Sequence, residues 1–190
     1  AAIFGGIGDQ VTASKVFLRV SGVQGLNVAP WAKYNINPNN GNYRPLPDPE
    51  NWARVSYALF PAQGKRPGLP DSEDPHALAK PGMKWSLMLA FGPGVSDVQQ
   101  KQVWEALRWW VNFGGLGART RRGLGAFRVS GVVGNGAPSN LIKPISPQEA
   151  QEAGCRLLLR SPQSSADAAW QGAIRKLQEF RQLPSLARNP

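Results

Sequence analysis

The sequence has little of the chemistry that disulfides and metal centres need. Among its 190 residues there is one cysteine, Cys155, and one histidine, His76. A single cysteine cannot form an intramolecular disulfide, and no Cys/His pair has the spacing of zinc ligands. The composition therefore predicts no cofactor and no metal site, and it favours a reducing, cytoplasmic setting.

Long apolar runs are also missing. No stretch approaches the ~18 consecutive apolar residues that a membrane-spanning helix requires. Residues 1–15 lack the basic and apolar regions of a secretory signal. We therefore expect no membrane partner. Because Ala1 is not a methionine, we also expect that the chain begins inside a longer protein.

Acidic residues are few. The chain has 12 Asp and Glu against 22 Lys and Arg, which gives a net charge of +10. Half of this net charge lies between Lys101 and Arg128, where Glu105 is the only acid. Positive charge concentrated in one segment favours a polyanionic partner such as nucleic acid.

Glycine and proline are abundant, with 21 and 17 residues, and they predict many turns and long connections. Runs of branched and aromatic residues at 15–23, 52–60 and 83–91 predict strands. Two long polar segments, 27–51 and 62–82, separate these runs. Loops of this length are typically functional or disordered, and we expect them to wrap a partner.

A helix is predicted over 96–113, because Ser96 and Gln99 form a capping-box pattern and apolar residues recur at helical spacing after them. A strand at 125–133 and an amphipathic helix at 165–184 follow. The order predicts an α+β fold: a ferredoxin-like (RRM-like) antiparallel sheet with helices on one face and long loops. We expect a domain at 1–145 and a C-terminal helical extension at 146–190.

The stretch "NFGGLGARTRRGLGAFRV" joins the helix to the last predicted strand. Its five glycines allow the backbone to turn its N–H groups toward a ligand, and its arginines offer forked donors that match phosphate oxygens. A helix cap and a bulged strand entry are the simpler explanation, but they need only one or two glycines. A dinucleotide-binding motif is excluded because Thr120 stands where its third glycine belongs. A Walker A phosphate-binding loop is excluded because its G-K-[ST] sequence is absent. The loop therefore favours binding of a sugar-phosphate backbone.

This loop resembles the glycine-rich loop of the RAMP superfamily, the RNA-binding proteins of CRISPR effector complexes. It is most similar to the large capping subunit of the type III-B (Cmr) complex, with its GGxGxRxRRGxG pattern after a helix. The N-terminal "AAIFGGIGDQVTASKVFLRV" is similar to a second stretch of that family, in which a short "FG" motif precedes Ser-Lys and a strand. The family also has an upstream region that this chain lacks.

The resemblance implies a ferredoxin-like fold and an RNA-binding subunit of a type III CRISPR effector ribonucleoprotein, acting in antiviral defence. The implied partners are CRISPR RNA, target RNA and other CRISPR-Cas subunits. The residues that it implies as RNA contacts are Gly114, Gly115, Gly117, Arg119, Arg121, Arg122, Gly123 and Gly125, with Ser14 and Lys15 as weaker candidates.

Two other functions stay open from the sequence. One is a CRISPR RNA-processing endoribonuclease of the same superfamily, with His76 as a base; the other is a basic structural protein of a larger ribonucleoprotein. A lone loop histidine is more often solvated than catalytic, as are the nearby Asp71, Glu73 and Asp74. We therefore favour a non-catalytic protein and assign no catalytic residue.

Aromatic residues of the first long loop are ambiguous. Trp31, Tyr34 and Tyr43 lie among Lys33 and Arg44, so they suit stacking on unpaired bases or packing that anchors the loop. The three tryptophans of the predicted helix, Trp104, Trp109 and Trp110, are instead expected in the core.

Overall fold

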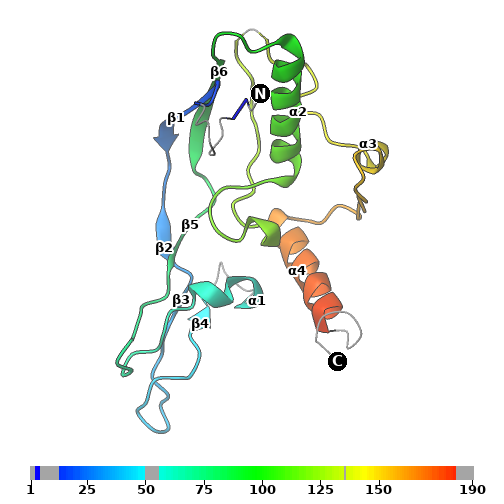
Figure 1. The fold of residues 1–190 in the computed structure, drawn as a ribbon. Coiled ribbons are helices and arrows are strands. Elements are labelled where there is room, and N and C mark those ends of the chain that lie inside the picture. Colours follow the sequence, from blue (N-terminus) through cyan, green and yellow to red (C-terminus); the bar gives the residue numbers. More distant parts are fainter. Residues whose placement is uncertain (1–2, 5–12, 50–55, 135, 183–190) are drawn as a thin grey trace, which may run out of the picture. The chain divides into compact units, whose positions relative to one another are not determined.

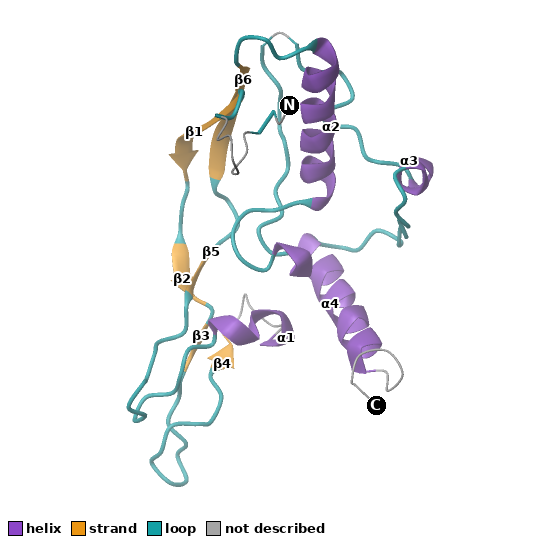
Figure 2. Cartoon of the chain, in the orientation of Figure 1, coloured by secondary structure: helices purple, strands orange, loops and turns teal. Residues whose placement is uncertain are grey.

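The computed structural model describes residues 3–4, 13–49, 56–134 and 136–182 of the chain (Figure 1). The fold is α+β, with small antiparallel sheets and helices (Figure 2). The chain divides into two compact units. The first consists of residues 1–24 and 84–160, and the second of residues 25–83 and 161–190. The long insertion between the two strands of the first unit therefore builds most of the second.

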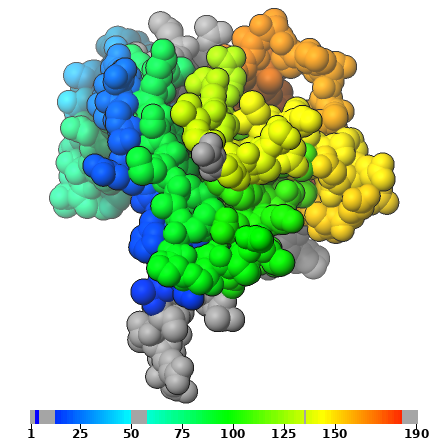
Figure 3. Space-filling view, turned by 90° about the horizontal axis from the view of Figure 1, so that it is seen from above, coloured from blue at the N-terminus to red at the C-terminus, as the bar shows by residue number. Residues whose placement is uncertain are grey.

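The first unit is built on a two-stranded antiparallel sheet. Strand β1 (Val16–Gln24) pairs with β6 (Lys84–Phe91), with Val16 opposite Phe91 and a bulge between Ser21 and Gln24. The two strands lie side by side in the space-filling view, blue beside green (Figure 3). Alternate side chains of β6 are half-buried, so one face of this sheet meets the rest of the unit.

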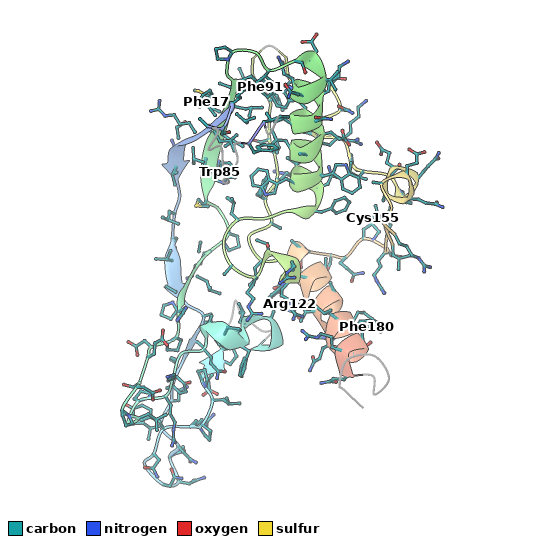
Figure 4. The ribbon with its side chains drawn as sticks, viewed as in Figure 1. Phe17, Trp85, Phe91, Arg122, Cys155 and Phe180 are labelled. Atoms are coloured by element: carbon teal, nitrogen blue, oxygen red, sulfur yellow. The ribbon has the colours of Figure 1, made fainter. Side chains whose placement is uncertain are left out.

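Helix α2 (Asp97–Phe113) covers that face. It begins at a capping box, in which the Ser96 hydroxyl accepts from the Gln99 N–H and the Gln99 side chain accepts from the Ser96 N–H. Phe91 of β6 meets Trp104 of α2 with their ring centroids 6.0 Å apart, and Val103 is only 3% exposed. Phe91 and Trp85 are labelled on β6 in Figure 4. Local capping and aromatic packing thus fix α2 on the sheet.

Two short helices also lie among the described residues of the first unit. Helix η2 (Thr120–Arg122) lies in the loop after α2, and α3 (Pro147–Glu152) follows further along the chain. Arg108 on α2 forms a salt bridge of 2.8 Å with Glu149 on α3, and the Asn112 side chain accepts from the Ile145 N–H. The yellow segment that contains α3 lies against α2 in Figure 3.

The second unit has two small sheets and two α-helices among its described residues. Strand β2 (Val28–Pro30) pairs with β5 (Ala77–Ala79), and β3 (Ala32–Lys33) pairs with β4 (Asp48–Pro49). Helix α1 (Ser56–Leu59) continues into η1 (Phe60–Ala62) and contacts α4 (Ala166–Gln182). The buried residues in the described part of this unit are Trp31, Ala32, Pro47, Ala58, Leu59 and Ile174.

Several local predictions are confirmed. The strands expected at 15–23 and 83–91 correspond to β1 and β6, and the helix expected at 96–113 is α2 with its capping box. The expected C-terminal helix is α4, and residues 183–184 of that prediction lie outside the described residues. Among the described helices, none has the length and apolar character to cross a membrane.

Two predicted strands are wrong. Residues 52–55 lie outside the described part of the chain, and 56–62 form α1 and η1, where Pro61 suits a helical first turn. Residues 125–133 join no sheet, although Phe127 and Val129 are half-buried between exposed neighbours. The described strands accordingly form three separate two-stranded sheets rather than one larger sheet.

Candidate nucleic-acid interface

The glycine-rich loop begins where α2 ends. The Gly114 N–H donates to the carbonyl of Trp110 at 2.7 Å and closes the last turn of the helix. A Cβ on Gly114 would overlap the Trp110 ring and its carbonyl oxygen. This glycine therefore serves as a helix cap and as a site of close packing, as the simpler explanation of the sequence requires.

The loop is closed at a narrow neck. The Leu116 N–H donates to the carbonyl of Gly125 at 3.0 Å. A Cβ on Gly125 would overlap the Leu116 carbonyl oxygen, and a Cβ on Gly115 would come within 2.9 Å of the Leu124 carbonyl oxygen. Gly125 also has a φ of +69°. Only glycine fits here, so the ends of the loop meet as in a compact Ω-loop.

The turn inside the neck places the arginines. Arg119 has a φ of +65°, the one positive φ among described residues other than glycine, and it starts η2. The Gly123 N–H donates to the Thr120 carbonyl at 2.8 Å, and Gly123 ends η2 in the left-handed conformation. A left-handed arginine costs on the order of 1 kcal/mol, and such strain concentrates at functional sites.

The loop exposes positively charged side chains to solvent. Arg119 and Arg121 are exposed, and neither forms a salt bridge with any described residue. The backbone N–H groups of Gly117, Ala118 and Arg119 donate to no other described residue. Arg122 is half-buried and is held by contacts of its own. Free guanidinium groups beside free N–H groups form a site suited to anionic oxygens.

An aromatic cluster fixes the chain on the far side of the neck. Phe127 packs against Trp110 of α2 at 4.5 Å between ring centroids and against Trp85 of β6 at 5.5 Å. Trp85 and Trp110 also contact each other at 6.3 Å. Both sides of the loop, residues 114 and 127, are thus tied to the core of the first unit.

Ser14 and Lys15 lie elsewhere in the same unit. They precede β1, where the Gly92 N–H donates to the Lys15 carbonyl and the Ser14 hydroxyl caps the Val16 N–H at 3.1 Å. Gly92 leads into the first turn of α2, whereas the glycine-rich loop follows its last turn (Figure 1). Seventeen helical residues span about 25 Å. The two predicted groups therefore lie at opposite ends of α2 and form no single cluster.

Aromatic residues of the second unit are mostly used in packing. Trp31 is 1% exposed, and its Nε1–H donates to the Ala62 carbonyl. The Tyr34 hydroxyl lies 3.4 Å from the Gly64 carbonyl oxygen, and burial raises the pKa of Tyr34. Tyr43 is 37% exposed. Trp31 therefore anchors the loop instead of stacking on bases, and Tyr43 keeps an accessible ring.

Each of two hairpins in the second unit holds a basic residue that forms a salt bridge. The first runs over 35–44, where Ile36 bridges Tyr43, and the second over 65–73, where Lys65 bridges Glu73. Arg44 forms a salt bridge with Asp48 at 3.2 Å, and Lys65 forms one with Asp71. The hydrogen bond between Lys65 and Asp71 and their opposite charges raise the pKa of Lys65 and lower the pKa of Asp71.

His76 lies in the same region as these hairpins. Its Nε2 is 2.8 Å from Glu73 Oε1, its backbone N–H donates to the Ala62 carbonyl, and its side chain is about half exposed. No cluster of three or more His, Cys, Asp or Glu side chains in the described residues is placed to hold a metal ion.

Two aromatic residues precede the loop: Trp109, which was expected in the core, and Phe113, which was not singled out in the sequence. Trp109 is half-buried, and its ring lies 5.4 Å from that of Phe113, which is 50% exposed. Trp104 and Trp110 face the sheet as expected, but Trp109 does not. At about 100° per residue, Trp110 lies about 20° from the buried Val103 around the helix axis, whereas Trp109 lies about 120° from it.

A family model described as the RAMP superfamily matches residues 1–128, which include the glycine-rich loop, α2, β1 and β6. The chain belongs to the RAMP superfamily. Membership indicates a CRISPR-associated role in RNA binding or processing. No curated protein and no solved structure gives a significant match.

Proposed function

We propose that this RAMP protein is a non-catalytic RNA-binding subunit of a type III CRISPR effector complex, most like the large capping subunit of type III-B. In this role the glycine-rich loop binds the backbone of guide RNA, target RNA or both. The observation that carries the proposal is the closed loop that presents Arg119 and Arg121 without acidic partners. The loop residues assigned to RNA are Gly114, Gly115, Gly117, Arg119, Arg121, Arg122, Gly123 and Gly125.

The loop supplies the two kinds of donor that a phosphate requires. Guanidinium groups give charge-assisted hydrogen bonds, and a curved backbone with free N–H groups adds neutral donors. Such contacts read the backbone rather than the bases, so the binding should be largely independent of sequence. Each neutralised phosphate of a single strand also contributes about 0.7 to the salt dependence of binding.

Ser14 and Lys15 serve in this proposal as a separate, weaker contact. They lie about 25 Å away along α2, so a strand that reaches both sites has to follow the helix. Lys15 places its Nζ near Gly94 at the start of α2. A bound RNA can therefore use the two sites through different nucleotides.

We further propose that the 1–145 region is a ferredoxin-like domain with 146–190 as its extension, and that another subunit covers β1. Strand β1 has only β6 as a partner among the described residues. Leu18 and Val20 of β1 lie on the same face of the sheet as the residues of β6 that α2 covers. They are nevertheless 59% and 57% exposed. An unpaired strand edge with exposed apolar side chains invites pairing with a neighbouring chain.

The alternative of an RNA-processing endoribonuclease depends on His76. This histidine is paired with Glu73 and lies in the second unit, whereas the loop lies in the first. The binding role therefore needs no contribution from His76. We expect the His76→Ala variant to bind RNA as the unmodified chain does, and we expect neither protein to cleave repeat RNA.

Photo-crosslinking tests the proposal. The purified chain is irradiated with 4-thiouridine-labelled single-stranded RNA, digested, and its crosslinked peptides are sequenced. We expect crosslinks within residues 114–128 and no cleavage of repeat RNA with or without EDTA. Crosslinks confined to 35–44 and 65–73 would refute the loop as the binding site. Cleavage that His76→Ala abolishes would establish the nuclease instead.

A further inference from the structure

An aromatic pair lies at the C-terminal end of α2, directly before the glycine-rich loop. Trp109 and Phe113 are one helical turn apart, with ring centroids at 5.4 Å and ring planes at 42°. Phe113 is the last residue of α2 and directly precedes Gly114. Half of its surface is exposed. The pair therefore stands at the entrance of the loop that holds Arg119 and Arg121.

Core packing does not account for this pair. The other aromatic residues of α2 contact the sheet side, Trp104 through Phe91 and Trp110 through Trp85. Trp109 and Phe113 contact each other, and neither has a ring contact with an aromatic residue of β6 among the described residues. A single exposed aromatic residue needs no explanation, but two in contact directly before an open basic loop bring aromatic and cationic side chains together in one short segment of the chain.

The Trp109 ring is held in a defined orientation. Its Nε1–H donates to Glu105 Oε1 at 2.9 Å, so the polar edge of the indole is satisfied within the helix. Glu105 also lies 3.6 Å from Arg108, which reduces its repulsion of a nearby anion. A ring fixed in this way loses little conformational entropy when a flat ligand stacks on the pair.

We propose that Phe113, supported by Trp109, is a stacking site for an unpaired RNA base whose neighbouring phosphates the loop binds. This inference rests on the proposed function and extends it from backbone binding to recognition of single strands. Aromatic platforms beside basic grooves bind successive bases by stacking, with little dependence on sequence. Bases within an A-form duplex are not free to stack in this way. The occupant is therefore a single-stranded segment.

The test compares three ligands of equal length in fluorescence anisotropy: a single-stranded RNA, an abasic ribose-phosphate strand and an RNA duplex. We expect Phe113→Ala to weaken binding of the single-stranded RNA by about 5- to 150-fold, the range for loss of one base–aromatic stack. Binding of the abasic strand and of the duplex should not change. Phe113→Trp should restore the affinity for the single-stranded RNA.

Phe180→Ala is the matched control, because Phe180 is 53% exposed on α4 in the other unit. It should leave all three affinities unchanged, and thermal melting should show that both variants are folded. Equal losses for the single-stranded and abasic ligands in Phe113→Ala would overturn the stacking site, as would no loss at all.

A second variant, Arg119→Gln with Arg121→Gln, separates this inference from the proposed function. If it weakens binding of both the single-stranded and the abasic ligand while Phe113→Ala weakens neither, then the loop binds RNA and the stacking site is wrong. If it weakens neither ligand, the proposed function fails, and the stacking inference fails with it.

Discussion

The glycine-rich loop and the two hairpins of the second unit are both basic, turn-rich surface segments, and both were candidates for RNA contact. They differ in how their charges are used. In the hairpins, Arg44 and Lys65 form salt bridges with Asp48 and Asp71. In the loop, Arg119 and Arg121 form none with any described residue.

The aromatic residues of the two regions differ in the same way. Trp31 is buried and donates to the Ala62 carbonyl, so it stabilises the second unit from within. Phe113 is half exposed at the end of α2. A count of basic and aromatic residues ranks these regions as similar, but a phosphate or a base binds more strongly to side chains that have no competing partner. For RNA binding, the number of basic and aromatic side chains that have no partner therefore matters more than their total number.

The largest effect is expected from Gly125→Ala. The added Cβ overlaps the Leu116 carbonyl oxygen and the residue needs a φ of +69°, so the neck opens and the three arginines lose their placement. One phosphate contact contributes about 4-fold to the affinity at 0.15 M salt, so RNA binding should fall by about 50-fold. Anisotropy titration measures this loss.

Gly131→Ala is the control for that substitution. A Cβ on Gly131 meets no atom within 4 Å, and its φ is not positive. It should bind RNA as the unmodified chain does. Retention of full affinity by a folded Gly125→Ala protein would show that the closed neck is not required.

Trp31→Phe tests the other side of the comparison. It removes one of the two donors to the Ala62 carbonyl, which keeps the His76 N–H, and should destabilise the chain by about 0.5 to 1.5 kcal/mol. Urea denaturation measures this change. RNA affinity should stay the same, because Trp31 is packed rather than exposed. Lost affinity in a variant that is still folded would indicate that the second unit contacts RNA.

Glu149→Gln examines a paired arginine in the same unit as the loop. The hydrogen bond from Arg108 lowers the pKa of Glu149 from 4.5 to about 2. A carboxyl group whose pKa is lowered in the folded state stabilises the fold at pH values above its ordinary pKa. This stabilisation is lost as the pH falls from about 4.5 toward 2. The melting temperature of Glu149→Gln should therefore lie below that of the unmodified chain at neutral pH and converge with it near pH 2. A constant difference down to pH 2 would contradict the assignment.

Local signals predicted part of this structure from sequence. The capping box at Ser96, the spacing of Val103 and Leu107, and the branched runs of β1 and β6 act over a few residues, so these elements were found. The segment 125–133 has the alternation of a strand, but strand formation needs a partner, and Phe127 packs by its ring instead. Sequence pattern alone carries no information about that partner.

The sequence predicted which residues make up the candidate site, but it did not predict how they are arranged in space. The glycines and arginines of the loop are recognisable in order, but the neck between Leu116 and Gly125 is a contact that no local rule supplies. The distance between Lys15 and the loop likewise follows only from how α2 lies on the sheet. Trp109 could have been placed correctly, since Val103, Leu107 and Trp110 define one side of the helix and Trp109 lies about 100° or more from each of them.

The most direct test of the account is the salt dependence of RNA affinity in two matched double variants. Arg119→Gln with Arg121→Gln removes two charges from the loop, and Arg44→Gln with Lys65→Gln removes two charges from the hairpins. The first should lower the slope of log affinity against log salt concentration by about 1.4 and the affinity at 0.15 M salt by roughly 10- to 15-fold. The second should change neither. Equal slopes in the two variants would contradict the claim that the free arginines of the loop bind the RNA backbone.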